Sequence, residues 1–224
     1  MKMKNRKIWV LLVTCLMTTS AFADINLQAV YMKDNVETTT SENFTAEAPL
    51  HVRFLSNASS LDPEAQLEWH ITNKATGSNI TRYDENIELD FTEAGEHTIK
   101  LQVRQDDMIV YEDVIIVTIS ESHLEMPNAF SPNGDGINDL YKAKSNHKSI
   151  VEFHAYIFNR YGQKLYDWTD INGGWDGTSH GSPVKDGVYF VYVKARGADN
   201  VEYNIRRDVN LLRNFNELEN GNGK

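Results

Sequence analysis

The run N-G-D-G-I-N-D at 133–139 is the stretch whose residue types come closest to a metal-binding loop. Calcium takes several oxygen ligands at alternate positions around a tight glycine turn. With Gly136 at the sixth place of such a loop, the third, fifth and ninth places fall on Asn133, Asp135 and Asp139. Ser131 and Lys142 occupy the first and twelfth places, where acidic ligands are needed. The pattern therefore favours an Asx-rich turn that satisfies its own backbone, with weak structural calcium binding as the alternative and no other cofactor.

A formal match to the G-x-S-x-G nucleophile elbow occurs at 177–181, which reads G-T-S-H-G. That motif works where a strand turns sharply into a helix and exposes the serine above an oxyanion hole. Pro183 follows at once, and no neighbouring segment has a helical period. Catalysis would need Asp176, Ser179 and His180 in one pocket, and the seven histidines show no metal-ligand spacing. The sequence therefore predicts a protein that is not an enzyme.

Five aromatic residues of the C-terminal half are candidates for a carbohydrate-binding or protein-binding face: Tyr156, Phe158, Trp175, Tyr189 and Tyr192. Tyrosine and tryptophan also pack routinely in a core with only a polar tip exposed. The favoured interpretation is that these are half-buried aromatics of a β-sandwich, with Trp175 anchoring the long loop around it.

Short alternating segments separated by polar turns must position these residues, because residues 25–120 show no sustained helical period. Within 97–104, polar side chains alternate with Ile99, Leu101 and Val103, which predicts one wet and one buried face. Six strands are expected, at 27–32, 50–55, 67–72, 86–91, 97–104 and 110–119. Strands at this spacing indicate a β-sandwich.

The rest of the chain predicts a second antiparallel sandwich after a linker at 121–125. Pro127 and Pro132 exclude a regular central strand at its entry. Strands are expected at 150–160, 164–168, 188–196 and 201–212, with a long loop at 169–187. Residues 214–224 are polar and predict a disordered tail.

The first 23 residues have the features of a secretory signal: a basic end, an apolar run and the small-x-small sequence Ala21-Phe22-Ala23. The apolar run is too short to span a membrane. It contains the only cysteine, Cys15, so a chain cut before Asp24 would lack thiol chemistry; lipidation at Cys15 is the less favoured alternative. That chain would carry 18 basic and 32 acidic residues, and its net charge of −14 argues against nucleic-acid binding.

Several motifs follow one another in the C-terminal part: M-P-N-A-F-S-P-N-G-D-G-I-N-D at 126–139, I-F-N-R-Y-G at 157–162, G-W-D-G at 174–177 and G-V-Y at 187–189. Together they resemble the type B C-terminal sorting domain associated with gliding motility and type IX secretion in Bacteroidetes. Spaced motifs in one order are more specific than any single motif. The positions that carry the resemblance are Pro127, Asn128, Phe130, Pro132, Asn133, Gly134, Asp135, Gly136, Asn138, Asp139, Asn159, Arg160, Gly162, Trp175, Asp176, Gly177, Gly187 and Tyr189.

The segment 91–103, together with Trp69, more loosely resembles a PKD or immunoglobulin-like domain. The two resemblances imply a PKD/Ig-like β-sandwich at 24–120 and a sorting domain at 126–213. The residue patterns add the signal peptide at 1–23, the linker at 121–125 and the tail at 214–224. This fold is all-β, with two tandem antiparallel Ig-like sandwiches.

The resemblance further implies Sec-dependent export to the periplasm, followed by recognition by the type IX outer-membrane translocon. The protein would then lie at the cell surface or outer membrane, or be secreted. Implied partners are translocon proteins, surface lipopolysaccharide or a periplasmic sensor, as for small accessory proteins of the PorA kind. The alternative function is a minimal surface adhesin or glycan-binding protein.

Overall fold

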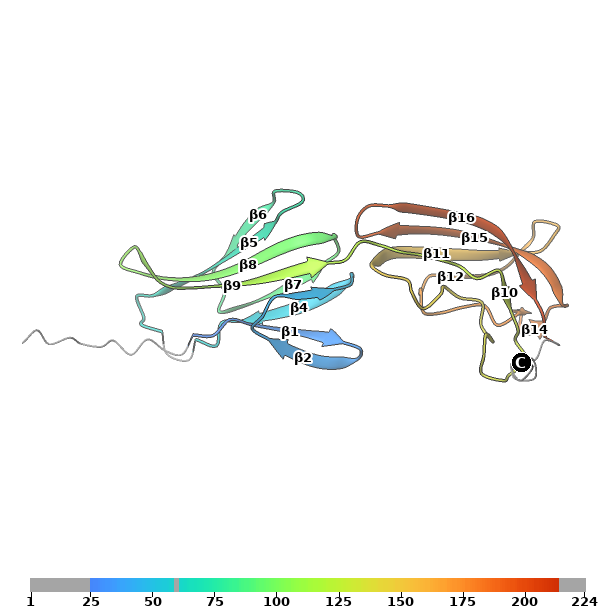
Figure 1. Ribbon diagram of the computed structural model, residues 1–224, viewed down its shortest axis with the longest axis horizontal. Coiled ribbons are helices and arrows are strands. Elements are labelled where there is room, and N and C mark those ends of the chain that lie inside the picture. The colour runs from blue at the N-terminus through green and yellow to red at the C-terminus, as the bar shows by residue number, and fades with distance from the viewer. Residues whose placement is uncertain (1–24, 59–60, 214–224) are drawn as a thin grey trace, which may run out of the picture.

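The chain folds into two all-β units placed end to end, as a computed structural model shows (Figure 1). The structure describes residues 25–58 and 61–213. The predicted signal peptide at 1–23 and the predicted tail at 214–224 lie outside the described residues. Within the described ranges every regular element is a strand, and no helix is long and apolar enough to cross a membrane. The all-β prediction is confirmed.

Two facing sheets form the first unit, residues 25–120. Their strand orders are β2-β1-β4-β7 and β3-β9-β8-β5-β6. The strands are β1 Gln28–Lys33, β2 Val36–Thr40, β3 Phe44–Ala46, β4 Leu50–Leu55, β5 Gln66–Asn73, β6 Asn79–Arg82, β7 Asn86–Phe91, β8 Gly95–Gln105 and β9 Met108–Ile119. Neighbours pair antiparallel, except for the parallel pair of β3 with β9.

Alternation along the central strands places apolar side chains between these sheets, because successive strand residues point to opposite faces. Trp69, Phe54 and Ile99 are fully buried there, and the Trp69 Nε1–H donates to the carbonyl of Asp84 at 2.9 Å. All six expected strands are present. The three unexpected ones, β2, β3 and β6, lie at sheet edges and are mostly exposed, so they lack the apolar alternation that marks a buried strand.

One five-stranded sheet, of order β10-β16-β15-β11-β12, is the basis of the second unit, residues 121–213. The strands are β10 Ala129–Phe130, β11 Ile150–Phe158, β12 Lys164–Trp168, β13 Thr178–Ser179, β14 Ser182–Pro183, β15 Gly187–Gly197 and β16 Glu202–Leu211. The four expected strands are present. β10 lies between Pro127 and Pro132 and pairs parallel with the end of β16, at the sheet edge where proline is tolerated.

The two faces of this sheet differ. The inner face is covered by the extended chain before β11, by the loop after β12 and by the short β13–β14 hairpin, and it holds a core that runs from Leu124 to Leu211. The outer face carries charged and half-buried aromatic side chains.

A hydrogen-bonded joint connects the two units. Ala198, in the β15–β16 turn, is buried against the core of the first unit. Its carbonyl accepts a bond from the N–H of Ala94, and its N–H donates to the carbonyl of Ser149, both at 2.9 Å. The Ser149 hydroxyl accepts from the N–H of Ala48 at 3.2 Å and contacts the Ser120 hydroxyl at 2.8 Å. The units are therefore joined by packing and hydrogen bonds at their junction, in addition to the chain itself.

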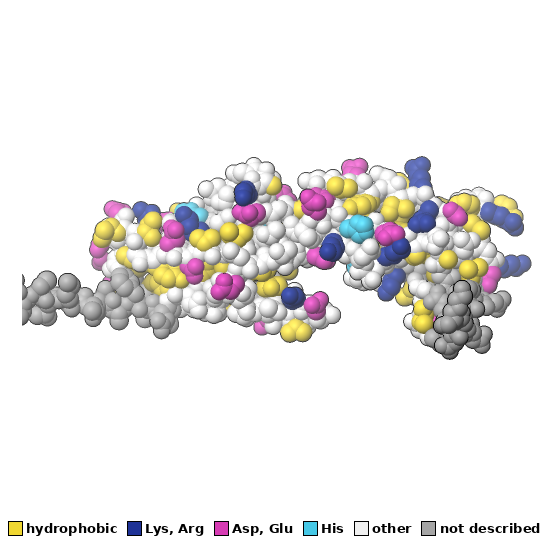
Figure 2. Space-filling model, in the orientation of Figure 1, with side chains coloured by type: hydrophobic (Ala, Val, Ile, Leu, Met, Phe, Trp, Pro, Cys, Tyr) yellow, Lys and Arg dark blue, Asp and Glu magenta, His cyan; other side chains and the backbone are white. Residues whose placement is uncertain are grey.

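Charge is distributed unevenly between the units. Residues 25–120 contain 17 acidic and six basic side chains, whereas residues 121–213 contain 12 acidic and 11 basic ones. Figure 2 shows the dark blue Lys and Arg side chains concentrated on the second unit, at the right. The acidic character of the protein thus belongs almost entirely to the first unit.

Candidate functional site at the distal end of the second unit

Motif segments that are far apart in the sequence meet at one end of the second unit, which we call the distal end because it points away from the first unit (Figure 1). β11 and β16 end there and β15 begins there, because these neighbours are antiparallel. The parallel pair of β10 with the end of β16 brings the following loop, 131–139, to the same end.

The Asp139 carboxylate organises this loop. Its Oδ1 accepts the N–H groups of Asn133 at 3.0 Å and Gly134 at 2.7 Å, and its Oδ2 accepts that of Gly136 at 2.9 Å. Both glycines have a positive φ, +81° and +86°, a backbone conformation that residues with a side chain rarely adopt. The loop is therefore wound around one carboxylate.

The other two candidate calcium ligands are also engaged with the loop backbone. The Asn133 Oδ1 accepts the N–H of Asp135 at 3.0 Å, and the Asp135 Oδ1 accepts the N–H of Ile137 at 2.8 Å. These are the contacts of an Asx-rich turn. The described part of the chain has no group of three or more His, Cys, Asp or Glu that could hold a metal ion.

The loop should lose its order in acid. Hydrogen bonds from the N–H groups of Gly134 and Gly136 lower the pKa of Asp139 below its ordinary value. The stabilisation of the loop by the ionised Asp139 carboxylate is therefore fully present above about pH 4, the ordinary aspartate pKa. It is lost as the pH falls through the lower pKa of the folded state. The amide resonances of both glycines should titrate with a midpoint below about 4. Asp139→Asn should abolish that titration, and a midpoint above 4 would contradict the assignment.

An aromatic cluster supports the loop from the core side: Phe130, Tyr141, Trp175 and Tyr189. Trp175 is fully buried, with its ring centroid 5.3 Å from that of Phe130 and 5.1 Å from that of Tyr189, edge-on. Its Nε1–H donates to the carbonyl of Thr178 at 2.6 Å. Trp175 therefore fixes the long loop 169–186 to the sheet.

Tyr141 belongs to this cluster but was not among the residues predicted from the sequence. Its backbone exchanges two hydrogen bonds with that of Trp175, at 2.9 and 3.0 Å. Its hydroxyl donates to the carbonyl of Pro127 at 3.0 Å, and burial raises the pKa of Tyr141. These contacts tie the entry segment, the loop and the tryptophan into one body.

Arg213, which follows β16, was also missed. Its Nη2 donates to the carbonyl of Gly177 at 2.8 Å, and its Nη1 donates to the carbonyl of Val184 and to the carboxylate of Asp186 at 2.9 Å. A Cβ at position 177 would lie 3.0 Å from Nη2, and φ there is +79°. Gly177 thus leaves room for the arginine that fastens the loop to the last strand.

The turn after β11 forms the remaining part of the distal end. The Asn159 Oδ1 accepts the N–H groups of Tyr161 and Gln163, both at 3.0 Å, and Gly162 has a φ of +80°. Arg160 lies over the Tyr161 ring, 5.2 Å from its centroid. This turn and residues 184–190 border a groove of about 540 Å³.

Three apolar side chains along this groove are exposed: Tyr161 (81%), Val188 (50%) and Phe190 (46%). Gly187, another motif position, lines the groove and begins β15 with a φ of +145°. The motif positions at 127–139 and 175–177 thus build the body of the distal end, and those at 159–162 and 187–189 shape its groove.

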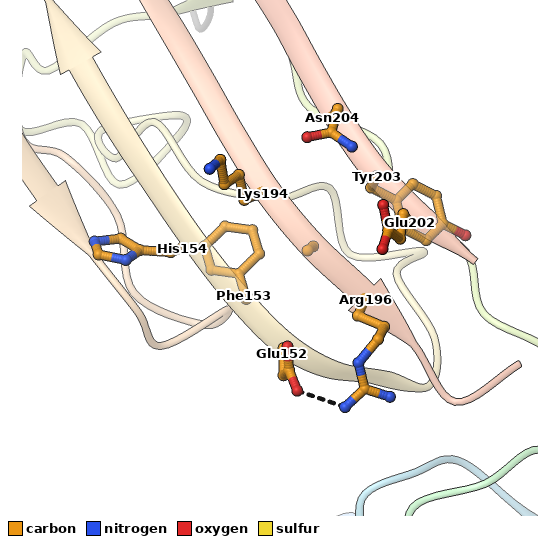
Figure 3. A pocket seen from close by; sticks show the side chains of 9 residues that line it. Glu152, Phe153, His154, Lys194, Arg196, Glu202, Tyr203 and Asn204 are labelled. Carbon is orange, nitrogen blue, oxygen red and sulfur yellow. Dashed lines mark hydrogen bonds and ion pairs between the residues drawn. The ribbon is translucent and has the colours of Figure 1, made fainter. Parts of the chain in front are cut away.

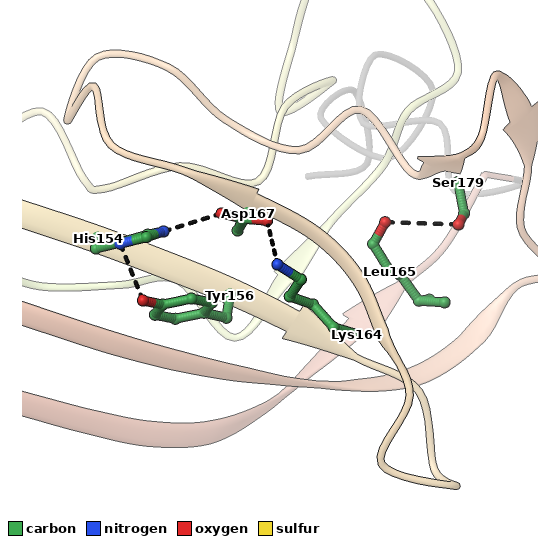
Figure 4. Close-up of polar contacts among 6 residues, drawn as sticks. All are labelled: His154, Tyr156, Lys164, Leu165, Asp167 and Ser179. Carbon is green, nitrogen blue, oxygen red and sulfur yellow. Dashed lines mark hydrogen bonds and ion pairs between the residues drawn. The ribbon is translucent and has the colours of Figure 1, made fainter.

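The G-T-S-H-G segment is a β-hairpin. His180 and Gly181, with φ of +50° and +76°, form the turn between β13 and β14. The Ser179 hydroxyl donates to the carbonyl of Leu165 at 3.5 Å (Figure 4). The Asp176 Oδ1 accepts the N–H and hydroxyl of Thr178, at 2.9 and 2.7 Å. The strand-to-helix turn that activates such a serine is therefore replaced here by a hairpin.

The five aromatic candidates lie on opposite faces of the sheet. Trp175 and Tyr189 belong to the core. Tyr156, Phe158 and Tyr192 lie on the outer face, where Tyr156 is next to both of the others. Period-two alternation could have separated Tyr189 from Tyr192, but sequence analysis treated the five as one group.

All of these motif positions lie within a region that matches a known family. Residues 124–205 match the CHU_C Type IX secretion signal domain. The secretion signal domain is a sorting or anchoring module, so this region interacts with the type IX machinery and directs export toward the cell surface or secretion. No curated protein matches the chain.

The similarity to solved structures is low, with TM-scores near 0.3. A tetra-tandem repeat from the extending region of a large adhesion protein has a TM-score of 0.30 and 12% identity, covering 86% of this chain and 68% of that one. Dimeric latent PorU from Porphyromonas gingivalis gives 0.28 and 11%, covering 83% and 20%. A two fibronectin type-III domain segment from chicken tenascin gives 0.31 and 12%, covering 74% and 93%.

Proposed function

We propose that the protein is a non-enzymatic exported protein whose distal end is the surface read by the type IX outer-membrane machinery after Sec-dependent passage to the periplasm. The convergence of the motif segments at the distal end, where two of them line one groove, carries this proposal. Exposed aromatic and aliphatic side chains beside a groove are typical of protein interaction sites. Tyr161, Val188 and Phe190 would be the main contacts.

The proposal is tested with the full chain in a bacterium that has a type IX system. The double variant Tyr161→Ser, Phe190→Ser removes both exposed rings. If each ring contributes more than about 1 kcal/mol to recognition, the surface-exposed fraction should fall more than tenfold. Protease accessibility on whole cells measures that fraction.

The matched control is Tyr83→Ser, which removes from the first unit a ring whose exposure (60%) lies between those of Tyr161 (81%) and Phe190 (46%). It should leave surface display unchanged. Normal display of the double variant, or display of the wild-type protein in cells without the translocon, would contradict the proposal.

The first unit is proposed to be the part that binds a partner. In this role the protein would act as an accessory or signalling component of the apparatus, with the first unit in contact with a periplasmic sensor. The strong negative charge of the first unit favours a partner with a basic surface. The second candidate is a minimal adhesin at the cell surface.

A further inference from the structure

The outer face of the second unit's sheet carries an ordered row of side chains that the sorting function leaves unused. Direct cross-strand neighbours in this row are Arg206 on β16, Tyr192 on β15, Tyr156 on β11 and Asp167 on β12. The Tyr156 and Tyr192 rings are 6.1 Å apart and inclined by 22°. The row therefore crosses four strands from a cation, over two aromatic rings, to a carboxylate.

Two cations flank Tyr192. The guanidinium of Arg206 lies 4.9 Å from the ring centroid and the ammonium of Lys194 lies 5.6 Å from it, both within cation–π range. Neither group forms an ion pair with any residue in the described ranges. Two positive charges without a carboxylate partner thus gather at one aromatic ring.

The carboxylate in the row is already neutralised. Asp167 contacts Lys164 at 2.7 Å and His154 at 3.0 Å (Figure 4), and His154 in turn contacts the Tyr156 hydroxyl at 2.9 Å. The positive charges beside Tyr192 are therefore those of Arg206 and Lys194, and the acidic side chains on the same face, Glu202 and Asp208, lie on β16 on either side of Arg206.

A hollow of about 400 Å³ continues this face toward the first unit (Figure 3). Hydrogen-bonding side chains line it, including those of Lys194, Asn204 and Glu202. The Arg196 guanidinium contacts Glu152, its direct neighbour on β11, at 2.5 Å. Aromatic rings beside a polar hollow suit a ligand that has both an apolar face and many hydroxyl groups.

We propose that this outer face binds an acidic polysaccharide of the uronic-acid type. A sugar ring can place its C–H face on an aromatic ring, its carboxylate can pair with Arg206 and Lys194, and its hydroxyls can reach the polar hollow. An acidic peptide would match the charge of Arg206 and Lys194, whereas a sugar ring would also offer a C–H face to the neighbouring Tyr156 and Tyr192 rings. The site goes beyond the proposed sorting function, because it lies on the sheet face and not in the distal groove.

Affinity electrophoresis of the full chain tests this site with polygalacturonate as the probe. We expect retardation by polygalacturonate and none by neutral dextran. Arg206→Gln should weaken binding about tenfold through loss of one charge-assisted contact. Tyr192→Leu keeps the apolar volume but removes the ring plane, and should weaken binding to a similar extent while the melting temperature stays near wild type.

Arg82→Gln is the control, because it removes one exposed cation from the first unit. It should change the affinity less than about twofold, because a distant charge is screened. Three results would each overturn the proposal. The first is no retardation by polygalacturonate, and the second is an equal loss of affinity with Arg82→Gln. The third is that the wild-type protein binds polyglutamate as strongly as polygalacturonate and that Tyr192→Leu does not alter the binding of polyglutamate.

Discussion

Replacing Trp175 with alanine is expected to lower the free energy of unfolding of the second unit by about 4 kcal/mol. The indole is fully buried and packs against Phe130 and Tyr189. Its removal leaves a cavity and also frees the carbonyl of Thr178, which accepts the indole N–H. Because this ring fixes the long loop, the whole distal end should become less ordered.

Urea unfolding followed by far-UV circular dichroism measures the change. The exposed Tyr161 provides the matched control, because Tyr161→Ala in the same unit should cost less than about 0.5 kcal/mol. A loss below about 1.5 kcal/mol for Trp175→Ala would show that the loop is fixed by other contacts.

Substituting Gly197 with alanine is expected to disrupt the joint between the units at a cost of about 3 kcal/mol. A Cβ at this position would lie 2.0 Å from the Ser122 Oγ, 2.3 Å from the Ser122 Cβ and 2.4 Å from the Asp199 Oδ1. The Ser122–Asp199 hydrogen bonds, at 2.7 and 2.9 Å, would have to break. Ala198 is the next residue, so its contacts with the first unit should shift as well.

Two measurements follow this substitution. Small-angle scattering should report a broader distribution of distances, and differential scanning calorimetry should separate the unfolding of the two units. Glu202→Gln, on the exposed strand that follows the turn, is the control and should leave both profiles unchanged. An unchanged scattering curve for Gly197→Ala would mean that the joint tolerates the displacement of Ser122.

Sequence alone located the strands that have one buried face. In β8, apolar side chains recur at every second position, and this period is sufficient to predict a strand. The sequence alone could not locate β10, because two residues between prolines show no period. This strand is defined only by its pairing with β16, about eighty residues later in the chain.

The distal end was predictable in the same partial way. The Asn and Asp residues of the loop 133–139 are close in sequence, so their Asx turns follow from local chemistry. Arg213 and Tyr141 could not be found by such reasoning, because their partners lie 14 to 36 residues away and depend on the final topology. The alternation of the strand is enough to place Tyr189 and Tyr192 on opposite faces, but which face is the core depends on the packing of the loop around Trp175.

The uneven charge of the two units gives the molecule a large electric dipole along its long axis. Residues 25–120 carry a net charge of −11, and residues 121–213 carry −1. At physiological ionic strength the field of the acidic end extends only about 8 Å into solution, so it acts during close approach and not at long range. Near a negatively charged bilayer, repulsion should turn the acidic end outward and present the nearly neutral end, with its sorting motifs, to the membrane.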